Sequence, residues 1–243
     1  MSRTMHQIAF DVVHDEIIAP NPFAEAILVF RGGANGEEPP LRIIQGPKTR
    51  MHNPDKVAVD PIHDEIFVPQ VATDSILVFN REANGDVEPI RIIHGPKTKL
   101  DGPGKLVVDY LNDLLIVIDS TASFLVFNRT DNGDVAPQAI IPTRGETGRG
   151  PVRMAFYPQG KKIFLRTPVE GRGDSIGVWQ YTAGEDGVDI SLWAVIEDTT
   201  YPDLSIRGIG LNPEAKEVMT LIRKGGKPAA PALRVYHVPE VFE

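Results

Sequence analysis

The stretch "ILVFNREANGDVEPIRIIHGPKTKL", Ile76–Leu100, occurs almost unchanged one step earlier in the chain as "ILVFRGGANGEEPPLRIIQGPKTRM", Ile27–Met51. Such self-similarity at a period of about 20 to 50 residues is typical of repeat architectures such as solenoids and propellers. The number of copies and the secondary structure of one copy therefore decide the fold.

Two sequence markers count the copies independently. An apolar-aromatic block begins at Ile27, Ile76, Phe124, Ile176 and Leu233, with spacings of 49, 48, 52 and 57 residues. A short apolar segment, which ends in Asp in its best-preserved copies, begins at Ile8, Val57, Leu106, Met154 and Gly208, with spacings of 49, 49, 48 and 54 residues. Both markers indicate five copies of one unit.

One copy contains the signals of four short strands. Val57–Asp60 is rich in β-branched residues and is followed by the turn signal "DPIHDE", after which "EIFVP", "SILVFN" and "PIRIIHG" predict three more strands. The pair Asn84-Gly85 between the last two strands is typical of a type I′ hairpin turn, and it recurs at Asn35-Gly36 and Asn132-Gly133. No stretch shows sustained helical periodicity, so very little helix is expected.

Five consecutive units of this kind predict an all-β fold, a β-propeller of five blades with mostly four antiparallel strands each. We expect a single domain over residues 1–243, with blades at about 7–46, 56–95, 105–142, 153–198 and 207–238. The fifth blade stops seven residues after "LRVY" and is expected to keep three strands, which leaves an open edge for a second copy of the chain. A β-sandwich is the alternative, but a sandwich gives no reason for the repeat.

The first three copies, "AFDVVHDEIIAP", "AVDPIHDEIFVP" and "VVDYLNDLLIVI", resemble the blades of NHL-repeat β-propellers, in which an apolar strand ending in Asp precedes a turn and a second strand. The resemblance covers residues 7–141 well and the remainder loosely, because Tyr157 and Leu211 replace the Asp in the last two copies. It implies a propeller fold and a function among those of the family, whose members include peptide-, protein- and RNA-binding scaffolds as well as lyases and hydrolases.

The composition narrows the classes of partner. The formal net charge of −8 repels phosphate, so the chain is not expected to bind nucleic acid or a membrane surface. The longest dense apolar run, "LLIVI" at Leu114–Ile118, is far shorter than the roughly 18 residues of a membrane helix. We expect a soluble protein, cytoplasmic as given or exported if a signal peptide has been removed, and the lack of cysteine does not decide the compartment.

Aspartates and histidines recur at matching turn positions. Asp11, Asp60 and Asp109 end the first strand of their blades, and His14 and His63 follow in the same turns. We interpret them as turn-stabilising residues, and the alternative is a ring of catalytic or metal-binding carboxylates. No HxxxH or HExxH motif supplies two zinc ligands from one element, so no cofactor is predicted, although separate blades leave room for a divalent metal in the central channel.

The residues just before the first strand of each blade form the strongest candidate ligand site: Gln7, Lys56, Lys105, Arg153 and Arg207. In a propeller this strand lines the central channel, so four basic residues at this position predict a positive mouth that binds a carboxylate, phosphate or sulfate group. His52 and Asp119 complete the predicted ligand-binding set. Further cations in the linkers on the same side are Lys48, Arg50, Lys97, Lys99 and Arg149. The alternative interpretation is that all of these are solvated strand ends.

Two classes of function remain open. A binding propeller that recognises a small anionic ligand or a protein partner fits the weak motif content and is preferred. A propeller-type lyase or hydrolase would need a metal or a set of His and carboxylate groups at the channel, drawn from His6, His52 and Asp119, and no catalytic residue is assigned. The longer loops 166–175 and 223–232 are expected to carry specificity.

Overall fold

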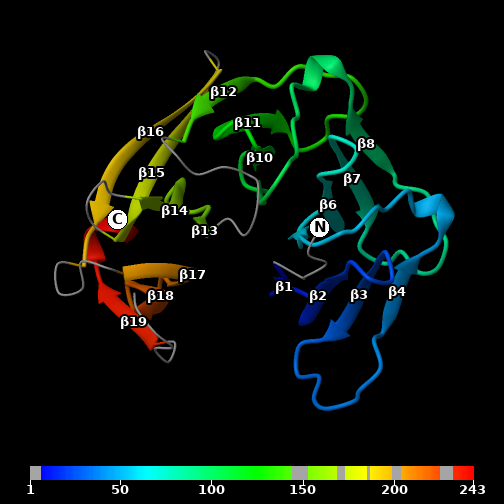
Figure 1. The fold of residues 1–243 in the computed structure, drawn as a ribbon, viewed down its shortest axis with the longest axis horizontal. Coiled ribbons are helices and arrows are strands. Elements are labelled where there is room, and N and C mark those ends of the chain that lie inside the picture. The colour runs from blue at the N-terminus through cyan, green and yellow to red at the C-terminus, as the bar shows by residue number, and fades with distance from the viewer. Residues whose placement is uncertain (1–6, 144–152, 169–172, 185–186, 199–203, 225–231) are drawn as a thin grey trace. The chain divides into compact units, whose positions relative to one another are not determined.

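The computed structural model describes residues 7–143, 153–168, 173–184, 187–198, 204–224 and 232–243. Its strands form five antiparallel sheets, and each sheet is built from strands that are consecutive in the chain, as the consecutive colours of Figure 1 show. The helices of the described residues are three short 3-10 turns, at Pro47–Thr49, Pro96–Thr98 and Pro239–Phe242. The protein is therefore all-β, with a five-bladed β-propeller fold, which confirms the predicted fold class.

The first three blades have four strands each. Blade one consists of β1 (Ala9–Asp11), β2 (Glu16–Asn21), β3 (Ala26–Arg31) and β4 (Arg42–Gln45). Blade two consists of β5 (Ala58–Asp60), β6 (Glu65–Gln70), β7 (Ser75–Asn80) and β8 (Arg91–His94). Blade three consists of β9 (Leu106–Asp109), β10 (Leu114–Ile118), β11 (Ser123–Asn128) and β12 (Ala139–Pro142). The inner strands β1, β5 and β9 lie beside one another in this order.

Blades four and five have longer strands. Blade four consists of β13 (Met154–Tyr157), β14 (Lys162–Pro168), β15 (Asp174–Gly184) and β16 (Gly187–Ile196). Blade five consists, in the described residues, of β17 (Leu204–Asn212), β18 (Glu217–Lys224) and β19 (Ala232–His237), with β19 as its outer strand. The chain divides into two compact units: the first holds blades one and two and most of blade three, and the second holds blades four and five. Pairing of the β19 edge with a second copy stays a prediction.

The two predicted specificity loops are shorter than expected. Arg166 belongs to β14 and pairs with Ile176 of β15, so the first loop begins later than the sequence suggested. The second loop, 223–232, is shortened from both ends by β18 and β19. The residues that connect these strands, 169–172 and 225–231, lie outside the described residues, so their role in specificity stays a prediction.

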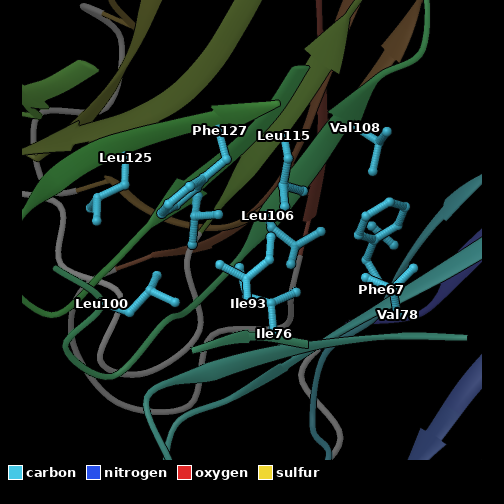
Figure 2. Packing of buried hydrophobic residues seen from close by; sticks show 12 residues of the cluster. Phe67, Ile76, Val78, Ile93, Leu100, Leu106, Val108, Leu115, Leu125 and Phe127 are labelled. Carbon is cyan, nitrogen blue, oxygen red and sulfur yellow. The ribbon is translucent and has the colours of Figure 1, made fainter. Parts of the chain in front are cut away.

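The core of the first unit is formed by aliphatic and aromatic side chains of neighbouring blades. One cluster of fully buried residues joins Phe67, Ile76 and Ile93 of blade two to Leu115 and Phe127 of blade three. Figure 2 shows these side chains gathered between the strands of the two blades. β10 is buried along its whole length, which explains why its sequence is a continuous apolar run and does not alternate with polar residues.

The Asn-Gly pairs do not form the type I′ hairpins that the sequence predicted. In blade two, β7 and β8 are separated by the ten residues 81–90, and Gly85 but not Asn84 has a positive φ. A type I′ turn requires a positive φ at both central residues. The predicted hairpin is therefore wrong, and the strands are joined by a longer connection.

The Asn-Gly segments of blades two and three instead dock on the outer strand of the preceding blade. Gly85 N donates to Ile43 O (2.7 Å), Gln45 N donates to Gly85 O (3.0 Å), and Asn84 Oδ1 accepts a hydrogen bond from Ile43 N (3.1 Å). Blade three makes the same three contacts with β8. We call these segments the plugs, because each one pairs the edge of the sheet before it. The plugs are residues 84–86 and 132–134.

Buried ion pairs join the same blades. Glu65 at the start of β6 accepts hydrogen bonds from Arg91 of its own blade (2.6 and 2.7 Å) and from Arg129 of blade three (2.9 Å). Burial alone would raise the pKa of Glu65, but the hydrogen bonds and charges of the two arginines outweigh burial and hold its pKa below the ordinary value. The equivalent residues between blades one and two are Glu16, Arg42 and Arg81.

Candidate functional site

The recurring aspartates cap their own turns. Asp60 Oδ1 accepts hydrogen bonds from the backbone N of Ile62 and of His63 (both 3.0 Å), and Asp60 Oδ2 lies 2.8 Å from Nδ1 of His63. Asp11 and Asp109 make the equivalent contacts in their turns. All three carboxylates are fully buried. These contacts are those of turn-stabilising residues, as the sequence predicted.

Three of the predicted ligand-binding residues lie at the starts of neighbouring inner strands of the first unit. Gln7 precedes β1, Lys56 precedes β5 and Lys105 precedes β9. The backbone N of Gln7 donates to Asp55 O (3.2 Å), which ties blade one to the linker that enters blade two. Gln7 Oε1 is buried and has no hydrogen-bond partner among the described residues. The structure therefore places these three positions along one edge of adjacent blades.

Lys56 and Lys105 occupy the same position in their repeats but have different surroundings. Lys56 is almost fully buried, and its Nζ lies 3.1 Å from both carboxylate oxygens of Asp55. Gly104 takes the place of that aspartate in front of Lys105. Burial lowers the pKa of Lys105 to about 8. The positive charge of Lys56 is thus matched by a carboxylate, whereas the Lys105 amine is partly neutral near pH 8.

We expect the Lys105 amine to titrate near pH 8, because burial disfavours the charged ammonium, whereas an ordinary lysine titrates at about 10.4. An NMR titration of the reductively methylated protein measures this, and the Lys105→Arg variant identifies the signal by its loss. A Lys105 signal that changes only above pH 10, together with the other lysines, would contradict the prediction.

The other two predicted cations belong to the second unit. Arg153 precedes β13 as expected, and its backbone O accepts a hydrogen bond from Arg166 N (2.9 Å). Arg207 does not precede a strand, because β17 begins at Leu204 and its pairing with β18 shifts register at Arg207. The predicted start of blade five at residue 207 is therefore wrong: the strand begins three residues earlier and contains a bulge, which no local sequence signal indicated.

His52 and Asp119 have separate surroundings in the first unit. His52 N donates to Gln70 Oε1 (2.5 Å), and His52 Nδ1 lies 4.0 Å from Oε1 of Glu25. Asp119 is buried directly after β10, and its Oδ1 accepts hydrogen bonds from N and Oγ1 of Thr121 (2.9 and 2.6 Å). The described contacts therefore do not join these two residues into one set.

Two of the remaining sequence candidates, His6 and Arg149, lie outside the described residues. Within the described ranges, no group of three or more His, Asp or Glu side chains is arranged to hold a metal ion. No helix of the described part is long and apolar enough to cross a membrane.

A cavity of about 720 Å³ lies between blades one and two of the first unit. Buried Met51 and Leu77 and the partly buried Ile92 contribute its apolar surface. This volume lies within the range of about 300 to 1,000 Å³ that is usual for small-molecule sites. Four ionisable side chains also line the cavity: Glu25, Arg50, His52 and His94.

These ionisable groups come from three segments that the fold brings together. Glu25 belongs to the loop between β2 and β3, Arg50 and His52 belong to the linker between the blades, and His94 ends β8. The sequence placed Arg50 and His52 among the candidates but missed Glu25 and the apolar residues.

A comparison of two repeats supplies a sequence signal for the cavity. Arg42–Lys56, "RIIQGPKTRMHNPDK", and Arg91–Lys105, "RIIHGPKTKLDGPGK", differ at six positions. Four of the six line the cavity: Gln45, Arg50, Met51 and His52. The first three strand residues, the Gly-Pro-Lys-Thr segment of the 3-10 turn and the final lysine are identical, so the repeats diverge mainly where side chains face the cavity.

No protein-family model and no curated protein matches the chain. Similar solved structures include hydrazine synthase of Kuenenia stuttgartiensis (TM-score 0.61, 13% identity, 97% of this chain and 63% of that chain). They also include the β-propeller domain of Cps50 (Swd1) from Myceliophteria thermophila (TM-score 0.61, 11% identity, 96% and 72%) and a protein from Lactobacillus plantarum (TM-score 0.64, 17% identity, 96% and 67%). At these identities the likeness shows the fold alone.

Proposed function

We propose that the chain is a ligand-binding β-propeller of the NHL-like kind, and that the cavity between blades one and two holds a small anionic molecule with an apolar portion. One observation carries the proposal: a cavity of ligand size combines buried Met51 and Leu77 with the guanidinium of Arg50. A mostly apolar wall with a few polar groups that fix orientation is the usual form of a small-molecule site.

The Arg50 guanidinium is the group of the lining that favours an anionic ligand. Glu25 is the single carboxylate among the described lining residues, and it lies 4.0 Å from the imidazole of His52. Within the described part of the chain the Arg50 side chain has no ion pair, so its charge is available to a ligand. A ligand carboxylate, sulfate or phosphate would receive charge-assisted hydrogen bonds from Arg50.

The other candidate functions remain predictions from the sequence. A lyase or hydrolase rests on the NHL resemblance alone, and the positive channel mouth rests on the strand-start cations. Lys56, one of those cations, is already paired with Asp55, which favours the cavity as the site of the anion.

The fluorescent probe anilinonaphthalene sulfonate tests the proposal, because it joins an aromatic body to an anionic group. We expect the Arg50→Asn variant to bind the probe about tenfold more weakly than the unmodified chain, because a charge-assisted hydrogen bond is lost. Asn is chosen because Arg50 has a left-handed φ of 58°, which Asn tolerates. Fluorescence titration measures the affinity.

Lys99 provides a matched control, because it has the same φ of 58° at the equivalent position of the next repeat and does not line the cavity. The Lys99→Asn variant should bind the probe as the unmodified chain does. In addition, Ala24→Trp should block the probe by filling the cavity, whereas Thr121→Trp, at the equivalent loop position of blade three, should not. Equal loss in the Arg50 and Lys99 variants, or no loss in either, would show that the cavity is not the anion site.

A further inference from the structure

A row of exposed aliphatic side chains follows the turns after β1, β5 and β9. Val13, Ile62 and Leu111 occupy the same position of these turns and are 55%, 56% and 56% exposed. Turn positions usually hold Gly, Pro, Asn, Asp or Ser, and each turn here is already fixed by its capping aspartate. The stability of the turns therefore does not explain the aliphatic residues. We call these three turns, residues 12–15, 61–64 and 110–113, the turn face.

Side-chain contacts between blades make the turn face continuous. His14 Nε2 of the first turn lies 3.6 Å from Asp64 Oδ1 of the second turn. Arg129 Nε of blade three lies 3.5 Å from Asp60 Oδ2, the capping carboxylate of the second turn. Because the backbone of each turn is also held by its cap, the aliphatic row is presented in a fixed arrangement. A partner that binds such a surface avoids the cost of ordering it.

Carboxylates lie in the same turns as the aliphatic row, and Asp15, Asp64 and Asp113 among them are accessible to solvent. Eight belong to the turns and to the adjoining strand ends: Asp11, Asp15, Glu16, Asp60, Asp64, Glu65, Asp109 and Asp113. Four arginines contact them: Arg42, Arg81, Arg91 and Arg129. The carboxylates thus exceed these arginines by four. Asp64 and Asp113 keep 48% and 65% of their side-chain surface exposed while paired.

We propose that the turn face docks a segment of a partner protein in which aliphatic residues alternate with lysine or arginine. The aliphatic residues of the segment cover Val13, Ile62 and Leu111, and its cations pair with the exposed aspartates at the rim. The charge disfavours other occupants, because a second copy would bring its own acidic turns into contact and anionic lipid or nucleic acid would be repelled. The turn face shares no residue with the cavity, so the two proposals stand independently.

A labelled peptide of alternating leucine and lysine tests the proposal by fluorescence anisotropy at low salt. We expect the triple variant Val13→Ser/Ile62→Ser/Leu111→Ser to bind the peptide about tenfold more weakly than the unmodified chain. The control Leu41→Ser/Ile90→Ser/Ile140→Ser removes three aliphatic residues that are equally exposed but lie at the outer strands. It should leave the affinity unchanged, and thermal melting shows that both variants are folded.

Two further peptides separate the contributions of charge and of apolar residues to binding at the turn face. A serine-lysine peptide, which keeps only the charge, and a leucine-glutamate peptide, which keeps only the apolar residues, should both bind more weakly than the leucine-lysine peptide. None of them should displace anilinonaphthalene sulfonate from the cavity. Equal affinity of the serine-lysine peptide, or equal loss in both triple variants, would overturn the proposal. Self-association that the Val13/Ile62/Leu111 variant abolishes would instead assign the turn face to a second copy of the chain.

Discussion

Replacing Glu65 with alanine is expected to lower the free energy of unfolding by about 3 to 5 kcal/mol, because Arg91 loses its carboxylate partner and Arg129 keeps only Asp60 and Asp113 among the described residues. Glu65 and Arg129 are both 9% exposed at the side chain, and Arg91 is 17% exposed, so water replaces the lost partner poorly. Urea denaturation followed by circular dichroism measures the change. A loss below about 1 kcal/mol, the size expected of a surface pair, would contradict the prediction.

Two comparison variants isolate the buried pair. Glu82 contacts Arg81 at 2.7 Å but is 69% exposed, so Glu82→Ala should change stability by less than about 0.5 kcal/mol. Blade three carries Leu114 at the position of Glu65 and Ala139 at that of Arg91. The double variant Glu65→Leu/Arg91→Ala copies this arrangement and should be more stable than Glu65→Leu alone, because it also removes Arg91, whose charge would otherwise lack a carboxylate among the described residues.

The same glutamate predicts a dependence of stability on pH. The pKa of Glu65 is lower in the folded chain than its ordinary value of 4.5, so its stabilising contribution is complete above that value and is lost as the pH falls through the lowered pKa. The stability of the Glu65→Ala variant should therefore fall less steeply below pH 4.5 than that of the unmodified chain.

The repeat predicts the fold well because its signals are local. The capping Asp60, the buried run of β10 and the position of each inner strand in the first three blades follow from residues that lie close together in the chain. The Asn84-Gly85 turn shows where local signals mislead, because the pair is as suitable for docking on β4 as for a tight hairpin. The hydrogen bond between Asn84 and Ile43, which lie about 40 residues apart in sequence, is what distinguishes the docked segment from a tight hairpin.

The cavity is harder to predict, because its lining comes from two blades and a linker that meet only in the folded unit. Arg50 has an equivalent in Lys99, and neither residue alone indicates a pocket. The useful signal is the difference between repeats, such as His52 in one copy and Asp101 in the next. Structural positions must stay alike from blade to blade, whereas positions facing one particular cavity are free to differ.

The strict repeat also stops for a physical reason. In blades one and two, the outer strand on which a plug docks donates a backbone N–H from Gln45 or His94, and a glycine follows directly. Blade three has Pro142 and Thr143 at these positions, so the donor is absent and a Cβ occupies the place of the plug aspartate. The change coincides with the end of the well-preserved repeat near residue 141.

Replacing Gly95 with alanine should therefore lower the free energy of unfolding by about 3 kcal/mol and release the plug of blade three. Gly95 has a φ of 131°, and a Cβ at this position would lie 2.5 Å from Cγ of Asp134. The change combines backbone strain with a clash against the plug. Hydrogen exchange measures the local effect: the amides of His94 and Gly133, which donate to Gly133 O and Ile92 O in the docked state, should exchange faster than in the unmodified chain.

Two variants separate the strain from the clash. Gly133 has a φ of 78° but its added Cβ would meet no atom within 4 Å, so Gly133→Ala carries strain alone and should cost about 1 to 2 kcal/mol. Asp134→Gly removes the whole clashing side chain, including the Cβ that would lie 2.7 Å from an added Cβ at Gly95, along with its hydrogen bond from Lys97 N (2.7 Å). If the clash destabilises the fold more than the strain does, Gly95→Ala/Asp134→Gly is more stable than the sum of the two single changes predicts. Strict additivity would show that backbone strain at Gly95, and not the fit of the plug, makes glycine necessary there.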